Sequence, residues 1–346
     1  LFRNLGNSRF EMVNQPAVET YARTSGAIFA DLDNSGALAL YVANNASVQS
    51  KRTDEPQRAA VLQRSQLFRN NAGKFVEISA ASGACPEALL SVRNVGVFDY
   101  DNDGLLDLFV VEDKFTRNPR SVLLHNIGHL KFQVVNKEAG LPDDIFGLGC
   151  AVSDLNGDGR PDLFVGHSSR LFLSQSGNTY REAVELREVF AQKPLHNEDW
   201  PCGVAFGDLN RDGLPDLVIS AHATPARNRV FINQGLKDGI PQFRDMTAEV
   251  GLADPVPAKC PHVEIQDFDN DGWPDIYVSA AWLENGEITP LIYRNTGLLK
   301  FEPVRPIKEP MVYFPAGPTA DFDNDGRLDL LLINWFAGNH TRLLRN

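Results

Sequence analysis

The acidic cluster DFDNDGWPD at 267–275 is repeated along the chain at a nearly constant spacing. Successive clusters start 68, 55, 54, 59 and 54 residues apart. A fixed period of this length indicates a repeat architecture, in which each repeat is one supersecondary unit that buries its core against its neighbours. The other five clusters stand at 31–39, 99–107, 154–162, 208–216 and 321–329.

A second element repeats with the acids: two apolar residues, a variable residue, and then Asn or Ser. It reads LFRN at 67–70 and is usually followed by a Gly and an alternating stretch such as KFVEISA at 74–80. Period-2 patterns bounded by Gly, Asn and Pro are typical of strands joined by turns. Each unit therefore predicts four strands, with the acids between the first and the second. The other copies of this LFRN-type element are at 1–4, 123–126, 171–174, 230–233, 292–295 and 343–346.

Four antiparallel strands that repeat about every 55 residues predict an all-β fold, a β-propeller of four-stranded antiparallel blades. Because the units run from one end to the other, we expect residues 1–346 to form a single propeller domain. The sequence does not favour a fold of helical repeats, since only residues 55–66 have a helix-like composition.

The spacing of the acids predicts calcium sites. In D-x-[DN]-x-D-G-x-x-D, side chains 1, 3 and 5 converge when the backbone curls, the Gly supplies the tight turn, residue 7 can offer its carbonyl, and Asp at 9 can close the site. The first half of this motif matches an EF-hand loop. The rest differs, because position 12 of the second cluster is Val110 where an EF-hand needs Glu, and the expected flanking elements are strands and not helices. For one copy, an acidic turn without metal is the alternative. Five intact copies at one period favour calcium.

The predicted calcium ligands are positions 1, 3, 5, 7 and 9 of the intact clusters. In the first cluster Ser35 and Ala39 replace two acids, which predicts about five calcium ions and leaves a sixth site open. The residues are Asp99, Asp101, Asp103, Leu105 and Asp107; Asp154, Asn156, Asp158, Arg160 and Asp162; Asp208, Asn210, Asp212, Leu214 and Asp216; Asp267, Asp269, Asp271, Trp273 and Asp275; Asp321, Asp323, Asp325, Arg327 and Asp329; and, in the first cluster, Asp31, Asp33 and Ser35.

The chain resembles the FG-GAP/VCBS calcium-binding propellers, a family that includes the integrin α-subunit head and the cartilage acidic proteins. The resemblance rests on the DxDxDGxxD loops, on LFRNNAGKF at 67–75 and on the tails VVNKEAGL at 134–141 and DMTAEVGL at 245–252. It implies a seven-bladed ring, with ends trimmed because seven LFRN-type elements accompany six acid clusters. A six-bladed ring closed by the N-terminal strands is the alternative. For function the resemblance is less specific, because the family includes adhesion receptors, lectins and uncharacterised secreted proteins.

Composition and motifs exclude several functions. The net charge of −12 argues against a nucleic-acid partner, and no apolar run reaches the 18 residues that membrane insertion needs. The chain has no HExxH, GxSxG or P-loop motif, so we expect no enzyme. The alternative is a secreted enzyme, or a propeller associated with one, with its site at the channel mouth. Its candidates are His196, Asp199 and Cys202, and the pair Cys260 and His262.

We expect instead a non-catalytic recognition or adhesion module that binds a protein or glycan through the face opposite the calcium loops. Variable loops on a rigid scaffold tend to carry function, and that face carries the insertion 44–65 and the segment 186–202. The expected ligand contacts are Trp200, Trp282 and Trp335, with packing between blades as the alternative.

The predicted location is extracellular or periplasmic, because weak calcium modules are filled outside the cytosol. The start at Leu1 without Met or signal peptide indicates a processed or trimmed product, part of a larger chain or assembly. The four cysteines leave the disulfide state open.

Overall fold

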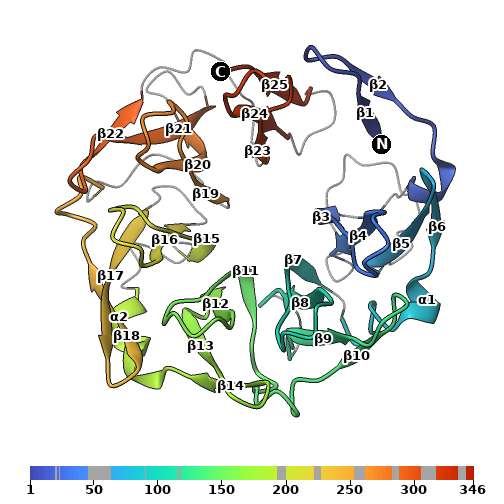
Figure 1. Ribbon diagram of the computed structural model, residues 1–346, viewed down its shortest axis with the longest axis horizontal. Helices are drawn as coiled ribbons and strands as arrows, with labels where there is room; N and C mark the ends of the chain where they lie inside the picture. The colour runs from blue at the N-terminus through green and yellow to red at the C-terminus, as the bar shows by residue number, and fades with distance from the viewer. Residues whose placement is uncertain are drawn as a thin grey trace, which may run out of the picture.

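The structure, a computed structural model, is a ring of small antiparallel sheets (Figure 1). It describes residues 1–19, 22, 24–45, 64–89, 91–114, 116, 118–192, 200–221, 227–252, 262–282, 288–304, 317–333 and 340–346.

Six sheets, each carrying one acid cluster, form the blades of a propeller. In the described part of the chain, five are four-stranded and the sixth is three-stranded. The blades are β3 (Thr24–Ala30), β4 (Ala39–Asn44), β5 (Gln66–Asn71) and β6 (Lys74–Glu77); β7 (Val92–Phe98), β8 (Asp107–Glu112), β9 (Val122–Asn126) and β10 (Phe132–Val134); β11 (Gly147–Ser153), β12 (Asp162–His167), β13 (Arg170–Gln175) and β14 (Thr179–Glu182); β15 (Pro201–Gly207), β16 (Asp216–Ala221), β17 (Arg229–Lys237) and β18 (Ile240–Asp245); β19 (Val263–Gln266), β20 (Asp275–Trp282), β21 (Ile288–Asn295) and β22 (Phe301–Val304); and β23 (Thr319–Ala320), β24 (Asp329–Leu332) and β25 (Arg342–Leu344).

The N-terminal strands stand apart from these sheets. β1 (Phe2–Asn4) and β2 (Phe10–Met12) pair only with each other. The predicted all-β propeller of four-stranded blades is therefore confirmed. The described strands form six blades, which is the number of the six-bladed alternative and not the seven that the resemblance favoured.

Helices are few and short in the described residues: α1 (Ser79–Ser82), α2 (Arg187–Phe190) and the 3₁₀ turns η1 (Pro16–Val18) and η2 (Val184–Leu186). No described helix has the length and apolar character needed to cross a membrane.

The core lies between neighbouring blades. The second strand of a blade is its most buried, and every residue of β4, β8 and β16 is buried. One cluster joins Val218 and Val230 of the fourth blade to Ile276, Val278 and Leu291 of the fifth. Because both faces of a blade are covered in this way, its central strands read as continuous apolar runs and not as alternating ones.

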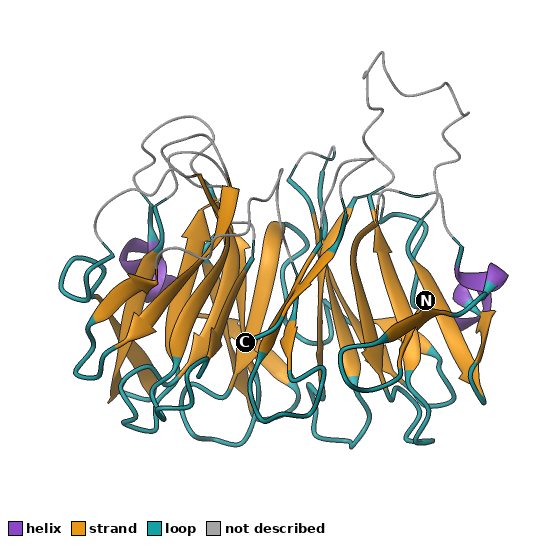
Figure 2. Ribbon diagram, turned by 90° about the horizontal axis from the view of Figure 1, so that it is seen from above, coloured by secondary structure: helices purple, strands orange, loops and turns teal. Residues whose placement is uncertain are grey.

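Chain direction assigns the loops to two faces of the ring. Each first strand runs into its acid cluster and the second strand returns antiparallel. All acid loops therefore lie on one face, and Figure 2 shows described loops gathered along the lower face of the ring, seen from the side. The starts of the first strands and the ends of the second strands lie on the opposite face.

Candidate functional site

The first Asp of each acid cluster builds the turn between the first two strands. In the second loop, Asp99 Oδ1 accepts the N–H of Asp103 at 3.1 Å and Oδ2 accepts the N–H of Gly104 at 2.8 Å. Positions 4 and 6 take positive φ, 59° at Asn102 and 87° at Gly104, a region that Asn and Gly tolerate best. The same two bonds recur in the other five loops, so the acid pattern first of all dictates a backbone shape.

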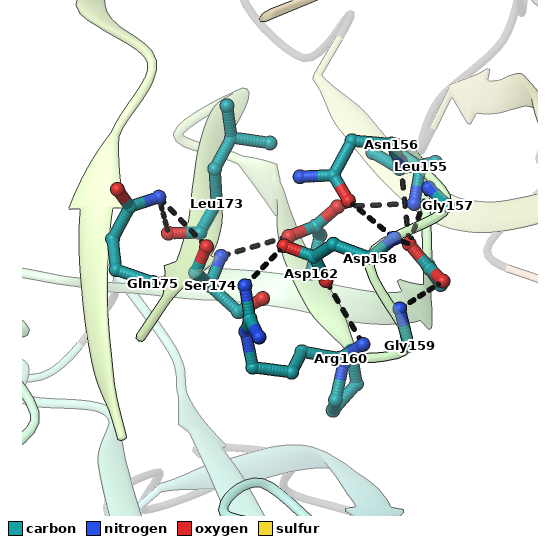
Figure 3. A network of polar contacts seen from close by, with 12 residues as sticks. Leu155, Asn156, Gly157, Asp158, Gly159, Arg160, Asp162, Leu173, Ser174 and Gln175 are labelled. Carbon is teal, nitrogen blue, oxygen red and sulfur yellow. Dashed lines mark hydrogen bonds and ion pairs between the residues drawn. The ribbon is translucent and has the colours of Figure 1, made fainter. Parts of the chain in front are cut away.

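The closing Asp of each intact loop is buried beneath it. In the third loop, Asp162 Oδ2 accepts the N–H of Leu155 at 3.0 Å, and Oδ1 accepts that of Ser174 in β13 at 2.8 Å (Figure 3). Burial raises the pKa of Asp162 to about 6, even though both backbone hydrogen bonds lower it. These contacts show a structural role that the sequence analysis missed, while metal ligation by the closing acid stays a prediction. The equivalent buried residues with the same two contacts are Asp107, Asp216, Asp275 and Asp329.

Three loops bring three carboxylates into one group. In each, one oxygen from positions 1, 3 and 5 lies within 4.8 Å of the others. In the third and fourth loops the middle position is an amide, Asn156 or Asn210. The three-acid groups are Asp99, Asp101 and Asp103; Asp267, Asp269 and Asp271; and Asp321, Asp323 and Asp325.

Two of the middle acids carry an oxygen that fits a cation. Oδ1 of Asp101 and Oδ1 of Asp323 are buried and have no hydrogen-bond partner in the described part of the chain. The two side chains are only 9% and 5% exposed. A buried carboxylate oxygen without a donor is costly unless a cation compensates it. Burial, and next the Asp103 carboxylate, raise the pKa of Asp101. These all-oxygen groups fit calcium, which would neutralise the converging charges and brace the turn.

The seventh residue of each loop was predicted to offer a carbonyl to the metal. The structure instead shows a contact of its main-chain N–H, which donates a hydrogen bond to the acid at position 5. In the second loop, the N–H of Leu105 donates to Asp103 Oδ1 at 2.8 Å. Ligation by the carbonyl stays a prediction. The other residues with this contact are Arg160, Leu214, Trp273 and Arg327.

The first loop keeps the turn without the full set of acids. Asp31 still accepts N–H bonds from Ser35 at 3.0 Å and Gly36 at 2.8 Å. At the closing position, Ala39 is buried and apolar. Asp33 belongs to none of the three-acid groups found among the described residues. This loop therefore shows that the turn can form with two acids fewer.

Arginines lie against two of the acid groups, a feature that the sequence analysis did not anticipate. Arg294 Nε is 2.5 Å from Asp269 Oδ2, and its Nη2 is 3.1 Å from Asp271 Oδ2. Arg345 Nη2 likewise lies 2.9 Å from Asp325 Oδ2. The sequence signal that could have revealed these contacts is the third residue of the LFRN-type element, where both arginines stand. These guanidinium groups offset part of the acid charge.

Neighbouring acid loops are also linked to each other. Asn34 Nδ2 donates to the carbonyl of Gly104 in the next loop at 2.8 Å, and Asn270 donates to Gly326 at 2.9 Å. Where the fourth position is Arg211, its guanidinium lies 5.2 Å from the ring centroid of Trp273 in the next loop. These contacts join the first loop to the second, the fourth to the fifth, and the fifth to the sixth.

On the opposite face, four side chains from three blades form a group that we call the Trp200 cluster. Lys114 follows β8, Phe146 precedes β11, His167 ends β12, and Trp200 precedes β15. Lys114 Nζ is 3.3 Å from the Trp200 ring centroid. The His167 ring meets Trp200 edge-on at 6.1 Å and lies 5.6 Å from the ring of Phe146. The cluster presents an aromatic surface with one cation.

Burial dominates the electrostatics of this cluster. Burial, helped by the charge of Lys114, lowers the pKa of His167 to about 4, and burial also lowers the pKa of Lys114. His167 is therefore neutral at pH 7. Its Nδ1 is buried and has no hydrogen-bond partner among the described residues.

The other two predicted ligand contacts are Trp282 and Trp335. Trp282 is the last residue of β20 and pairs with Ile288, while Trp335 lies outside the described residues. Of the insertion 44–65, the part 46–63 also lies outside them.

Of the residues of the enzyme alternative, the structure describes only Cys202 and His262. His196, Asp199 and Cys260 lie outside the described residues. Cys202 is buried and, like Cys85 and Cys150, a free cysteine. His262 Nε2 lies 2.8 Å from Glu264 Oε1, and Glu264 Oε2 accepts the Thr319 hydroxyl at 2.5 Å. These contacts place His262 in a structural network that joins the inner strands β19 and β23.

Comparison with known proteins identifies relatives over much of the chain. Human cartilage acidic protein 1 is 26% identical over 284 residues, which is 77% of this chain and 41% of that protein. The chain thus spans about two fifths of this relative's length. Mouse phosphatidylinositol-glycan-specific phospholipase D is 31% identical over 147 residues, which is 38% of this chain and 18% of that protein.

Among solved structures, AofleA from Arthrobotrys oligospora aligns with a TM-score of 0.50 and 10% identity. The alignment covers 94% of this chain and 83% of AofleA, a likeness that shows the fold alone.

A sequence model of the FG-GAP-like repeat matches four overlapping segments, 99–165, 154–219, 208–278 and 267–332. Each segment starts at an intact acid loop and extends into the second strand of the next blade. The matched repeats cover more than half of the chain, and the chain belongs to the FG-GAP-like repeat family.

Proposed function

We propose that this protein is a non-catalytic, calcium-stabilised recognition module that binds a protein or glycan partner through the face opposite the acid loops. The division of the loops between two faces supports this assignment. One face has repeated acid loops, in which the two hydrogen bonds of the first Asp recur in every blade. The other carries the side chains that differ from blade to blade, as recognition surfaces on rigid scaffolds do.

The observation that carries the proposal is the Trp200 cluster. An indole with a cation 3.3 Å from its ring centroid and a neutral imidazole at its edge combines an apolar surface with polar groups. Tryptophan beside a cation is a common anchor of binding surfaces. His167 adds a buried nitrogen, Nδ1, with no hydrogen-bond partner among the described residues, which a ligand hydroxyl or amide could satisfy.

Calcium has a supporting role in this proposal. The all-oxygen acid groups and the orphaned oxygens of Asp101 and Asp323 favour a hard cation. The ions would stabilise the face that carries the acid loops, and recognition would take place on the opposite face. Since weak calcium modules are filled outside the cytosol, we infer a secreted protein, extracellular or periplasmic. The cartilage acidic protein relatives are compatible with this inference.

The enzyme alternative has less support. The relative named as a phospholipase D matches only 38% of this chain and 18% of its own length. Among the described residues, His262 and Glu264 already form a network with Thr319. We therefore infer a binding role.

A pair of tryptophan variants tests the recognition face. Both Trp200 and Trp273 lie near a cation, Lys114 and Arg211 respectively, but they lie on opposite faces. We expect Trp200→Ala to weaken capture on a glycan array or by a purified protein ligand by about 2 kcal/mol or more, the scale of an interface hot spot. The control Trp273→Ala should bind normally. Equal binding by wild type and Trp200→Ala would remove the main support for this face.

Trp282→Ala and Trp335→Ala extend the comparison, with melting measured on the same samples. A ligand contact should lose binding and keep its melting temperature. A Trp packed between blades should instead cost about 3–5 kcal/mol of stability, and the remaining folded protein should bind normally.

The calcium role is tested by chelation. A site that binds only the folded state adds RT ln(1 + [L]/Kd), so five sites near or tenfold above Kd give roughly 2–7 kcal/mol. We expect a marked fall in melting temperature in excess chelator. An unchanged melting curve, after metal removal is verified, would contradict the calcium assignment.

A further inference from the structure

The second acid loop differs from the others in the residue that faces it from the third strand. This third position of the LFRN-type element is occupied, in blade order, by Arg69, His125, Leu173, Ile232, Arg294 and Arg345. In the second blade, His125 Nδ1 lies 3.3 Å from Asp107 Oδ1 and 3.7 Å from Asp101 Oδ2. One donor atom from each of these three residues lies within 4.8 Å of the other two.

The three side chains are held in place and largely removed from water. Asp107 is fully buried and the Asp101 side chain is 9% exposed. The His125 ring packs edge-on against Tyr100, with ring centroids 5.4 Å apart. Oδ1 of Asp101 is buried with no hydrogen-bond partner in the described part of the chain. The group therefore has a fixed geometry and an acceptor that still needs a positive partner.

The other blades cannot assemble the same donors. Arg294 and Arg345 reach the corresponding acids, but a guanidinium has no lone pair to give to a metal. The side chains of Leu173 and Ile232 have no donor atom. An imidazole nitrogen combined with two carboxylates is thus specific to the second blade among these positions.

An imidazole changes which metals a site prefers. Calcium selects oxygen ligands, whereas zinc, cobalt and similar divalent ions favour a histidine nitrogen together with carboxylates. We propose that the second blade holds a transition-metal site, formed by His125, Asp101 and Asp107, that takes a divalent ion such as zinc.

The two acids of this site also have other contacts. Each carboxylate oxygen has more than one lone pair, so Asp107 Oδ1 can ligate a metal while it also accepts the N–H of Asn126. Asp101 also belongs to the all-oxygen group of its loop, so the two ions would compete there.

Cobalt(II) tests this site because its visible absorption responds to nitrogen ligands and to coordination geometry. The purified chain is stripped with chelator and titrated with Co²⁺, and Zn²⁺ binding is measured by calorimetry. The variant His125→Arg installs the residue found in the fifth and sixth blades, and His125→Leu installs that of the third. The reciprocal variant Arg294→His places an imidazole beside Asp269 and Asp275. Circular dichroism and melting identify any variant that does not fold.

We expect the wild type to show a histidine-dependent Co²⁺ absorption and a Zn²⁺ site that both His125 variants weaken about tenfold or more. Arg294→His should gain a second absorption of the same kind. The proposal is overturned if a folded His125 variant binds Co²⁺ and Zn²⁺ as the wild type does, or if the wild type shows no histidine-dependent absorption. This readout is independent of the chelator melting experiment, so loss of the calcium assignment would leave it interpretable.

Discussion

The side-chain amide of Asn126 in β9 donates a hydrogen bond of 2.7 Å to the main-chain carbonyl of Leu32 in the acid loop of the preceding blade. The same amide also donates to the carbonyl of Leu106 in its own blade at 2.9 Å. One buried side chain therefore joins two successive blades. The equivalent contacts to the preceding loop run from Asn233 to Leu155, from Asn295 to Leu209 and from Asn346 to Phe268.

Removal of one of these amides should destabilise the ring. Asn295 is fully buried and donates to the carbonyls of Leu209 and Pro274 at 2.9 and 3.0 Å. Asn295→Ala leaves both carbonyls without this donor, and we expect a loss of about 1–3 kcal/mol in the free energy of unfolding, measured with urea. The control is Asn4→Ala, because Asn4 makes the same contact to Phe322 in an exposed position and should cost less. Equal costs would show that burial of the amide is not what matters.

Close packing between inner strands gives a second prediction. A Cβ added to Gly149 in β11 would lie 2.7 Å from the carbonyl oxygen of Cys202 in the next blade, whereas one added to Gly26 in β3 would meet nothing within 4 Å. We expect Gly149→Ala to cost about 1–3 kcal/mol through overpacking. Gly26→Ala should be neutral or slightly stabilising. The two melting temperatures, measured in one buffer, check this; a Gly149→Ala variant as stable as Gly26→Ala would mean that the inner strands can separate without cost.

The blades could be predicted from the sequence because their determinants are local. The acids, the Gly of the turn and the period-2 apolar strands all lie within one repeat, so five copies reinforced one interpretation. Contacts between repeats have no such signature. The bond from Asn126 to Leu32 spans 94 residues, and the Trp200 cluster draws on three blades. The burial of the closing Asp beneath its own loop was also missed, since the motif alone does not distinguish a ligand from a backbone acceptor.

The number of blades was harder to predict for a physical reason. β1 carries an LFRN-type element, and Asn4 contacts the carbonyl of Phe322 in the sixth blade at 2.8 Å, as a third strand would. Yet β1 pairs only with β2, and Phe2 and Met12 are 68% and 78% exposed. The sequence element thus encodes the contact with the preceding blade, but it does not determine whether a complete four-stranded sheet surrounds it.

An ion-pair group on the third blade predicts a pH dependence away from the acid loops. Arg170 contacts Glu182 through two nitrogens, at 3.0 and 2.7 Å, and Arg187 Nε lies 2.7 Å from the same carboxylate. Burial alone would raise the pKa of Glu182, but the hydrogen bonds from Arg170 and Arg187 outweigh it and lower the pKa below 4.5. A lowered folded-state pKa stabilises the protein above the unfolded-state value, and that stability is lost as the pH falls through the folded value.

We therefore expect Glu182→Gln to be less stable than the wild type by about 1.5–3 kcal/mol at pH 7, the range for hydrogen bonds to charged groups. The difference should shrink as the pH falls below about 4.5. Urea unfolding of both proteins from pH 7 to pH 3 measures it. A difference that stays constant over this range would mean that Glu182 acts through packing and not through its charge.

The last prediction separates an intact acid loop from the first one. Asp271 is the fifth-position acid of a three-carboxylate group, and its Oδ1 also accepts the N–H of Trp273 at 2.9 Å. Ser35 offers only a hydroxyl, in a loop whose closing position is the buried Ala39. Because calcium affinity depends on the number of charged oxygen ligands, we expect Asp271→Ala to lower the bound calcium by one ion per chain in equilibrium dialysis. Ser35→Ala should leave the number of bound calcium ions unchanged.

Both variants should keep the Trp200 cluster and bind a ligand of the opposite face as the wild type does once calcium is saturating. Equal losses of calcium would show that the first loop is a full site in spite of its missing acids, and no loss in either variant would show that these carboxylates serve only to shape the turn.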